Sequence, residues 1–491
     1  MLKIIFALLP LLSILFMIFV LKKSSIFTGI TACIITTVIA ISPAFNTSIK
    51  ILPESVTKSF LTSSIIVYIL FFGILLFQLM EKVGAIDGIA SSITTATDDK
   101  IYQVLILALG LSPLIEAVSG FGLAVILIAP ILIALGFSPI QSSVIALISL
   151  CIIPWGTLAL GTIIGATLGD IPLQELGMGS ALMSIPIYIY FAVLVAYIGA
   201  GKKALKESIL QVLFIGFLLG FSVWICNRFA SVELAGIFGS LIVIVVIFLM
   251  IKLKHKRSNL SQESSFSFLK NISPYLLLIL LLFTSRIIHP IKDFLSGFLN
   301  ISIEKYNFQL ALLYSPGFFL MLVCIFTIFL FHLNRSAIID SIKLTINKCY
   351  PVIFTTFLYI VVSEIMSEAK MIEILSSTAA QSFGQFFIFI APLIGATGGF
   401  LTGSNTASNT MFIRLQTETA VQVGISPVLI ACAQNVSSSF MTMVNPSRVA
   451  LSCSVCKIST LENEIQNKLA FVGIGTITII FIELLIMYSL L

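Results

Sequence analysis

Long apolar stretches that carry almost no charge constrain this chain more than any other feature of its sequence. Between Ile101 and Gly169 the only charged side chain is that of Glu116. The whole chain is 58% hydrophobic and 10% charged, and it contains 40 phenylalanines. A water-soluble fold could not cover so much apolar surface with so few polar side chains. The sequence therefore predicts an integral membrane protein.

Uncharged runs of spanning length recur along the chain, for example residues 60–80, 179–201, 234–251 and 471–482 with its flanks. The alternating ten-residue strands of a β-barrel are not seen, so these runs are interpreted as helices. We expect an all-α integral membrane protein with about 11–13 transmembrane helices. The first run is followed by Lys22, Lys23 and a second run, which favours a retained helix over a signal peptide.

The charges in the loops predict how the chain is oriented. One lysine cluster at residues 202–206 and a second basic cluster at 252–257 are separated by two spans, so they lie on the same side. Their positive excess assigns that side to the cytoplasm. The loop at 169–179, with Asp170 and Glu175, is assigned to the outside. The net charge of +6 is explained by these topology signals, so nucleic-acid binding is not expected. We expect a multi-pass protein of a bacterial plasma membrane.

Two motifs occur twice in the same order. The pattern Pro-Leu-Ile-x-Ala-x-x-Gly-Phe stands at 113–121 and 392–400, and Gly-x-Ser-Pro stands at 136–139 and 424–427. Such paired matches indicate an internal duplication. By the loop charges, the first copy is entered from the cytoplasm and the second from outside. We therefore predict two inverted repeats, with an N-terminal half at 1–251, a basic cytoplasmic linker at 252–270 and a C-terminal half at 271–491.

Each repeat is expected to contain a re-entrant hairpin, around residues 112–123 and 392–410, because these segments are rich in glycine and too polar for plain spanning helices. Irregular backbone at membrane depth is tolerated only where protein encloses it or where it lines a cavity. The second hairpin has hydroxyl and amide side chains from Thr402 to Thr410, which can bind a carboxylate or a cation. The alternative is that these side chains hold packed helices together.

Glu116 lies in the first hairpin segment. An ionisable group inside hydrocarbon is costly unless it is paired, hydrated or protonated, so it marks a substrate or ion path by default. Inverted repeats with interrupted helices are typical of secondary transporters. We therefore interpret Glu116 as a proton carrier. The alternative is a structural carboxylic acid that donates a hydrogen bond across the two hairpins.

At these residues the chain resembles the L-lactate permease family. The resemblance rests on Glu116-Ala-Val-Ser-Gly-Phe-Gly122, Leu135-Gly-Phe137, Gly399-Phe-Leu-Thr-Gly-Ser-Asn-Thr-Ala-Ser-Asn-Thr-Met-Phe412 with Leu415-Gln416, Gly424-Ile-Ser-Pro427, Asn435 and Asn445-Pro446-Ser447. It implies proton-coupled uptake of L-lactate, and often of glycolate, by alternating access. The expected partners are a small carboxylate and the lipid bilayer. No metal and no cofactor other than the coupling proton are expected. Whether the protein forms a homodimer is left open. The predicted substrate-binding residues are Ser119, Gly120, Gly122, Ser404, Asn405, Thr406, Ser408, Asn409, Asn435 and Arg448, with Glu116 as the proton-coupling residue.

Three departures from the family pattern bear on the substrate. Asn405 stands where an aspartate is expected, and the stretch from Asn435 to Pro446 is one residue shorter and lacks the expected lysine. Arg448 follows that stretch, and Arg414 stands where a small or polar residue is expected. Either the cationic partner of the carboxylate has moved or the substrate differs. The tip also resembles the Ser-Asn-Thr tips of sodium-coupled dicarboxylate carriers, so a sodium-coupled carrier of another carboxylate is the alternative.

Two other classes of protein fit the sequence less well. A membrane enzyme needs a nucleophile with its base or a metal site, yet the chain has only three histidines, His255, His289 and His332, and no H-E-x-x-H motif or nucleophile elbow. Cys453 and Cys456 form one isolated CxxC, which is interpreted as two buried thiols. A channel would need a ring of filter residues from several subunits.

Overall fold

The computed structural model describes residues 2–120, 122–254, 262–306 and 308–490. Within these residues the regular secondary structure is helical except for one antiparallel hairpin, β1 (Asn300–Ile303) paired with β2 (Phe308–Ala311). The prediction of an all-α membrane protein is confirmed. Phe121 in the first predicted hairpin and residues 255–261 of the predicted linker lie outside the described residues.

Nine helical segments of the described chain are long and apolar enough to cross a membrane. They are Ile51–Lys82, Lys100–Ser119, Leu173–Phe229, Ala235–Leu253, Phe268–Ile287, Arg335–Glu368, Met371–Thr402, Pro427–Val444 and Ser459–Ser489. Pro139–Ile148 and Ile153–Gly169, bent by 56°, form a tenth candidate. Helix α10 (Leu173–Phe229) is itself interrupted at Gly201, where φ is 80°. The expected total of crossings stays a prediction.

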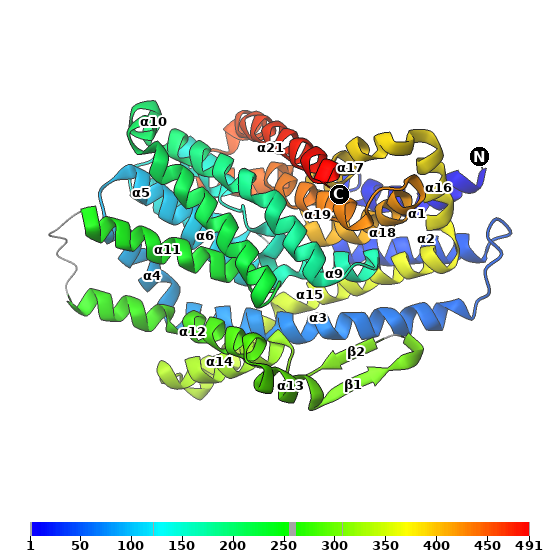
Figure 1. Cartoon of the computed structure of the whole chain (residues 1–491), viewed down its shortest axis with the longest axis horizontal. Helices are drawn as coiled ribbons and strands as arrows, with labels where there is room; N and C mark the ends of the chain where they lie inside the picture. Colours follow the sequence, from blue (N-terminus) through cyan, green and yellow to red (C-terminus); the bar gives the residue numbers. More distant parts are fainter. Residues whose placement is uncertain (1, 121, 255–261, 307, 491) are drawn as a thin grey trace.

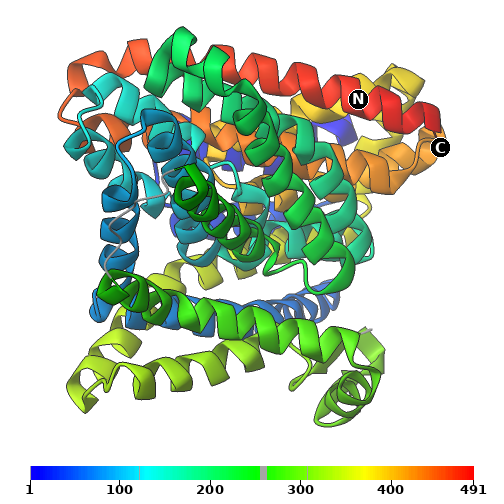
Figure 2. The same cartoon turned by 60° about the vertical axis from the view of Figure 1, so that its left-hand side comes forward.

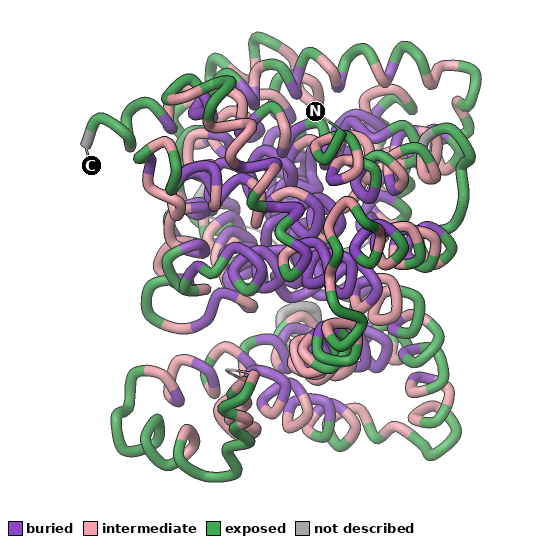
Figure 3. Tube along the Cα trace, turned by 90° about the vertical axis from the view of Figure 1, so that its right-hand side faces the viewer, coloured by how far each residue is buried: buried purple, intermediate pink, exposed green. Residues whose placement is uncertain are grey.

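Four shorter apolar helices accompany these spans: α1 (Leu2–Phe19), α2 (Ser25–Ile41), α7 (Leu123–Ala134) and α14 (Pro316–Leu330). Helices α11 (Ala235–Lys254), α12 (Gln262–Ile287) and α13 (His289–Gly297) lead to the hairpin. Helices α12, α13 and α14 lie with the hairpin on one side of α3 (Ile51–Lys82) (Figures 1 and 2). Buried residues concentrate in the centre of the larger bundle on the other side (Figure 3).

The two halves follow one order of elements. In the first half, α3 is followed by the short helix α4 (Ala85–Ala96). A continuous helical segment comes next, made of α5 (Lys100–Leu105), the π-helical turn η1 (Ile106–Leu111) and α6 (Ser112–Ser119), and it ends at a break. After this break come α7 and α8 (Pro139–Ile148), then a second break with the 3-10 turn η2 (Ile153–Trp155), and then α9 (Gly156–Gly169). In the second half, α15 (Arg335–Glu368) is followed by the short helix α16 (Met371–Phe383). The 3-10 turn η4 (Gly384–Phe386) and α17 (Phe387–Thr402) come next and end at a break. After this break come α18 (Asn405–Val423) and α19 (Pro427–Met441), then the 3-10 turn η5 (Thr442–Val444), and then α20 (Pro446–Val455). Helices α10 and α21 (Glu462–Leu490) then close the two series.

The matching helices α3 and α15 are antiparallel. Lys82 at the end of α3 pairs with Asp340 near the start of α15 at 3.3 Å, while Lys58 near the start of α3 pairs with Glu364 near the end of α15 at 2.7 Å. In Figure 1, α4 and α16, which follow them, accordingly lie toward opposite ends of the molecule. Opposed directions are what inverted repeats require, although the inversion of the complete halves stays a prediction.

The repeated Gly-x-Ser-Pro motif begins a helix in both halves. Ser138 accepts a hydrogen bond from the backbone N–H of Gln141 and forms a capping box with it, and Ser426 accepts one from Leu429. The following proline occupies the first turn, where its missing N–H costs nothing. The preceding glycines, Gly136 and Gly424, have positive φ angles of 83° and 74°, which suits the chain reversal before the new helix.

Both predicted hairpin tips are breaks between helices. Helix α6 ends at Ser119, and Gly120 and Gly122 follow with φ angles of 65° and 74°. Helix α17 ends at Thr402, Gly403 takes a φ of 64°, and Ser404 caps α18 by accepting from the N–H of Ala407. Glycine is needed at these positions because a Cβ atom disfavours positive φ. Each break exposes helix ends in the interior of the bundle.

Candidate functional site

Four breaks in helices come together inside the bundle. A methyl group on Gly156, at the start of α9, would lie 3.7 Å from Cγ of Glu116 in α6, and one on Gly161 would lie 2.6 Å from Nδ2 of Asn405 at the start of α18. One on Gly122 would lie 3.9 Å from Nη1 of Arg448 at the start of α20. Residues from both halves therefore surround one region, which we treat as the candidate site.

Glu116 is 1% exposed and lies in the last turn of α6. Its Oε1 accepts a hydrogen bond of 3.2 Å from the backbone N–H of Gly122, and the backbone of Ala124 in the first turn of α7 also faces the carboxylate. These N–H groups at the start of a helix stabilise a negative charge. Oε2 has no hydrogen-bond partner in the described part of the chain. Glu116 therefore retains one acceptor that can take a proton or meet a ligand.

Arg448 lies opposite Glu116. Its Nη1 is 4.0 Å from Oε1 of Glu116, and both side chains are largely buried. Nη2 donates a 2.9 Å hydrogen bond to the carbonyl oxygen of Gly403, so the guanidinium joins the first half to the tip of the second. Nη1 has no hydrogen-bond partner among the described residues. A buried guanidinium with a free N–H group is suited to bind a carboxylate.

Asn445 determines where Arg448 and the second tip lie. Its Oδ1 accepts from the N–H groups of Ser447 and Arg448 at the start of α20, and its Nδ2 donates to the carbonyl oxygen of Phe400 at 2.8 Å. One side chain thus caps α20 and also holds the last turn of α17. The Asn-Pro-Ser sequence therefore positions the arginine that follows it.

An amide cluster lies beneath the second tip. Oδ1 of Asn435 accepts from Nδ2 of both Asn405 and Asn409 at 2.9 Å. Nδ2 of Asn409 also donates to the carbonyl oxygen of Gly161 at 3.0 Å, and Nδ2 of Asn435 donates to Ser180 and Thr162. Asn409 and Asn435 are therefore occupied by protein partners and hold the tip in place. Oδ1 of Asn405 is buried without a partner within the described chain.

The other predicted site residues lie nearby but use their polar groups locally. Ser119 donates to the carbonyl oxygen of Ile115 at 2.6 Å, and Gly120 packs against Thr157. Ser404 caps α18, and the carbonyl oxygen of Thr406 accepts from Thr410. Ser408 accepts from Gln434 at 3.1 Å. These residues shape the backbone around the site, and their roles in binding stay predictions.

Several buried polar residues of this network were not among the predicted site residues. Gln434 donates to Ser408 and to Asn409, and it accepts a 2.5 Å hydrogen bond from Gln416. Thr162 and Ser180 contact Asn435 from the first half. Gln416 belongs to the stretch that resembles the permeases, and Gln434 adjoins Asn435, so a search for buried amides could have found both. Thr162 and Ser180 are ordinary helix residues in the sequence.

Strained backbone also borders the site. Thr157, Leu158 and Ala159 have φ angles of 51°, 56° and 57°, all in the left-handed region. This conformation costs a residue other than glycine roughly 1–2 kcal/mol. The three residues lie between Gly156, which is beside Glu116, and Gly161, which is beside Asn405. Such strain often accumulates at functional sites.

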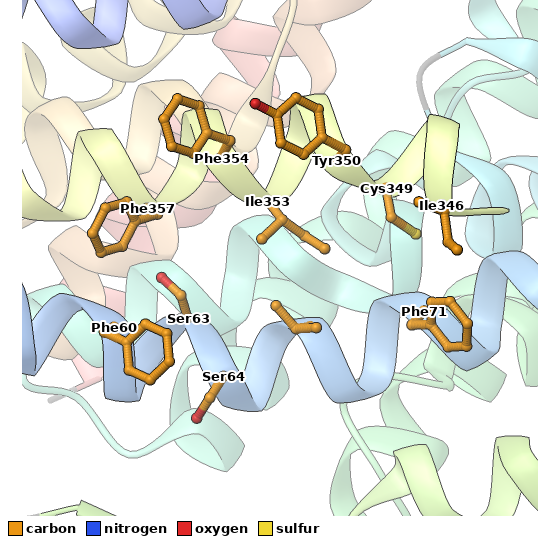
Figure 4. A pocket seen from close by; sticks show the side chains of 11 residues that line it. Phe60, Ser63, Ser64, Phe71, Ile346, Cys349, Tyr350, Ile353, Phe354 and Phe357 are labelled. Atoms are coloured by element: carbon orange, nitrogen blue, oxygen red, sulfur yellow. The ribbon is translucent and has the colours of Figure 1, made fainter. Parts of the chain in front are cut away.

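An apolar groove of about 600 Å³ lies elsewhere, between α3 and α15. Figure 4 shows Phe60, Phe71, Ile353 and Phe357 along it. Its polar lining consists of the hydroxyl groups of Ser63, Ser64 and Tyr350, and none of the described residues that line it carries a positive charge for a carboxylate. The candidate functional site is therefore the region between the four buried helix breaks, not this groove.

Comparison with known proteins gives the family. The family model described as L-lactate permease matches residues 3–491. The chain is 28% identical to an L-lactate permease of Streptococcus iniae over 74% of this chain and 80% of the relative. It is 25% identical to an L-lactate permease of Bacillus subtilis over 81% and 80%, and 24% identical to the glycolate permease GlcA of Escherichia coli over 84% of both.

These matches agree with the fold. The relatives are permeases of bacteria, so the expectation of a transporter rather than an enzyme is confirmed. Together with the candidate spans, they indicate a multi-pass protein of the cell membrane. The resemblance proposed from the two hairpin motifs extends over nearly the whole sequence, and the chain belongs to the L-lactate permease family.

Proposed function

We propose that this chain carries L-lactate, and the smaller 2-hydroxy acid glycolate, across the cell membrane together with one proton. The names of the relatives support the substrate class. The observation that carries the proposal is the buried pair of Glu116 and Arg448, whose atoms Oε2 and Nη1 have no hydrogen-bond partner among the described residues. One atom can take a proton and the other can bind a carboxylate.

Charge accounting connects the proton to the substrate. In the empty carrier, ionised Glu116 faces cationic Arg448 and the pair is neutral. In the loaded carrier, the substrate carboxylate binds Arg448 while Glu116 is protonated, and the site is neutral again. An anion bound without the proton would leave a net negative charge inside the membrane, which is costly. The site is therefore neutral in both the empty and the loaded carrier only if the proton and the substrate are carried together.

Asn405 is proposed to accept a hydrogen bond from the 2-hydroxyl group of the substrate. Its Oδ1 is a buried acceptor without a partner within the described chain, and Gly403, two residues earlier, is bonded to Arg448. A 2-hydroxy acid places a hydroxyl donor next to its carboxylate, so it can contact Arg448 and Asn405 together. A buried acceptor left unpaired by a substrate without the hydroxyl would disfavour that substrate.

Alternating access is the proposed way in which the site changes sides. Glu116 and Thr162 come from the first half, whereas Arg448, Asn405 and Asn435 come from the second. Movement of one half against the other would therefore open the site to one face at a time. The alternative is sodium coupling, which the neutral oxygen atoms of the Ser404-Asn405-Thr406 tip favour.

Uptake of labelled L-lactate into proteoliposomes separates these possibilities. With an acidic exterior and an alkaline interior we expect accumulation above equilibrium, and with an inward sodium gradient at uniform pH we expect none. Propionate, which lacks the hydroxyl group, should compete weakly. Accumulation driven by sodium alone would overturn proton symport in favour of the alternative. If neither the pH gradient nor the sodium gradient drives uptake of L-lactate, the proposed substrate class is wrong.

A further inference from the structure

A second buried carboxylate lies away from Glu116. Glu364, near the end of α15, has a side chain that is 4% exposed. Its Oε1 is 2.9 Å from Nη2 of Arg414 in α18, and its Oε2 is 2.7 Å from Nζ of Lys58 in α3. Both carboxylate oxygens therefore have a cationic partner, each from a different helix.

Arg414 extends this network to a fourth helix. Its Nε donates to the carbonyl oxygen of Leu168 at 3.0 Å, in the last turn of α9, and its Nη1 donates to the carbonyl oxygen of Ser363 at 3.4 Å. The side chain is 15% exposed. The three charged residues thus join α3 and α9 of the first half to α15 and α18 of the second. We call Lys58, Glu364 and Arg414 the charged triad.

The charged triad lies at one end of a close seam between α9 and α18. A methyl group on Gly165 would lie 3.0 Å from Nδ2 of Asn409, and one on Gly169 would lie 3.3 Å from Cγ2 of Thr417. The two helices are therefore in contact from the candidate site up to the level of Arg414. Helix α9 ends at Gly169, beside the loop that the charge pattern assigns to the outside.

The opposite end of the same two long helices is different. There Lys82 and Asp340 pair at 3.3 Å with side chains that are 43% and 47% exposed. An exposed pair of this kind contributes little, whereas removing one partner of a buried pair leaves an uncompensated charge. At the outer end Lys58 is also 43% exposed, but its partner Glu364 is 4% exposed and pairs with Arg414 as well. Among the described residues, the outer end of the α3 and α15 contact is therefore the one that holds a buried carboxylate.

We propose that the charged triad is a latch that holds the outer face of the carrier closed. Separation of α18 from α9 would take the Arg414 guanidinium away from the carbonyl of Leu168, and separation of the halves would break the pair of Lys58 with Glu364. Opening outward must therefore break the hydrogen bond of Arg414 to Leu168 and the ion pair of Lys58 with the buried Glu364, while opening inward leaves both intact. This inference rests on the alternating access proposed above.

Cysteine labelling of both faces tests the latch. In a protein whose eight native cysteines are replaced, Thr417→Cys reports on the outer seam, where Thr417 is 4% exposed, and Ser447→Cys reports on the exposed position beside Arg448. A membrane-impermeant thiol reagent is applied from outside in right-side-out vesicles and from inside in inverted vesicles, without substrate. The rates of labelling measure how often each face is open.

Glu364→Gln and Arg414→Gln should raise outer labelling of Thr417→Cys by about tenfold and lower inner labelling of Ser447→Cys. Arg414→Lys keeps a charge for Glu364 but loses the bond to Leu168, so it should give an intermediate change. Asp340→Asn, which breaks the exposed pair at the other end of the same helices, is the matched control and should change neither rate.

Opposite changes at the two reporters would support a latch, because loss of structure would raise both rates. The latch proposal would be overturned by unchanged labelling rates in variants that are folded, as shown by the same size-exclusion elution profile as the parent protein. It would also be overturned by faster labelling at both positions. Failure of lactate transport would not affect this result, since no substrate is present. If substrate and a pH gradient fail to shift labelling in the parent protein, alternating access itself is wrong.

Discussion

At the scale of single residues, the chemistry of the site depends on two charges that are far apart in the sequence. Glu116 receives N–H groups from the start of α7, and Arg448 is held at the start of α20 by the cap that Asn445 provides. The helix start stabilises the negative charge of Glu116, and the carbonyl oxygen of Gly403 at the end of α17 stabilises the positive charge of Arg448. Oε2 of Glu116 and Nη1 of Arg448 have no hydrogen-bond partner within the described chain.

Glu116→Gln should abolish accumulation driven by a pH gradient but leave exchange of internal for external lactate. The neutral amide resembles the protonated, loaded form, whereas the empty variant would hold Arg448 without a counter-charge and could not readily change sides. Accumulation and exchange are measured in the same proteoliposomes. Glu54→Gln removes an exposed carboxylate and is the control. Accumulation at the normal rate in Glu116→Gln would remove this residue from the coupling mechanism.

Arg448→Ala should raise the KM for lactate by about tenfold or more, because a buried carboxylate would lose its cationic partner. Arg448→Lys retains the charge without the planar fork and should raise KM less. Initial rates of uptake over a range of lactate concentrations measure the effect, and Arg228→Ala, at an exposed position, is the control. An unchanged KM would mean that the backbone N–H groups of the two tips suffice to bind the anion.

Arg414 illustrates a residue whose place could not be read from the sequence. An arginine in a membrane helix often extends its charge toward the membrane surface. Here the guanidinium instead turns inward to Glu364 and Leu168. Arg414→Ala is therefore expected to change the balance between the two faces, as the latch predicts, with a smaller effect on KM than Arg448→Ala.

At the scale of elements, the site depends on how closely α9 and α18 approach each other. Gly161 allows the start of α18 to lie against α9, so that Asn409 reaches the carbonyl oxygen of Gly161. Small residues let membrane helices approach at such short distances. The strained turn at residues 157–159 then directs the chain from Glu116 toward this contact.

Gly161→Ala should destabilise the protein by about 1–3 kcal/mol and reduce lactate uptake. The added methyl group would lie 2.6 Å from Nδ2 of Asn405 and 3.0 Å from the backbone nitrogen of Thr406, so the tip would have to move. Thermal unfolding in detergent and uptake into proteoliposomes measure the two effects. Gly297→Ala, whose added methyl group would have no neighbour within 4 Å in the described part of the chain, should change neither. Normal stability and uptake in Gly161→Ala would contradict the close seam.

At the scale of the whole molecule, contacts between the halves decide which movements are possible. Ser143 in α8 and Ser452 in α20 are buried, and their Oγ atoms are 2.8 Å apart. Ser112 and Ser149 form a similar contact of 2.6 Å, but both belong to the first half. The first pair therefore bridges the halves, while the second lies within one of them.

A disulfide between the halves should stop transport. Ser143→Cys with Ser452→Cys, in a background without the native cysteines, is expected to lose uptake on oxidation and regain it on reduction. Ser112→Cys with Ser149→Cys should stay active when oxidised, since it restrains one half alone. Peptide mass spectrometry verifies each bond. Full activity of the first pair in its oxidised form would mean that the halves do not move apart at this contact.

Local signals in the sequence determined much of the protein. The apolar runs indicated a helical membrane protein, because burial in lipid requires such runs whatever the packing. Gly-x-Ser-Pro marked two helix starts, because caps and turns depend on neighbouring residues. The glycines at 120, 122 and 403 marked breaks for the same reason, and the residues around Glu116 and Asn405 indicated the family.

Only the tertiary structure decided which polar groups meet. The sequence singled out Glu116 and Arg448, but it could not show that they face each other, and nothing local indicated that Glu364 pairs with Arg414. Thr162 and Ser180 likewise gained a place near the site only when α9 and α10 packed against α19. Hydrophobic burial is nonspecific and sets the helices, whereas an ion pair or an amide contact requires atoms within a few ångströms. That distance follows from how helices distant in the sequence pack together.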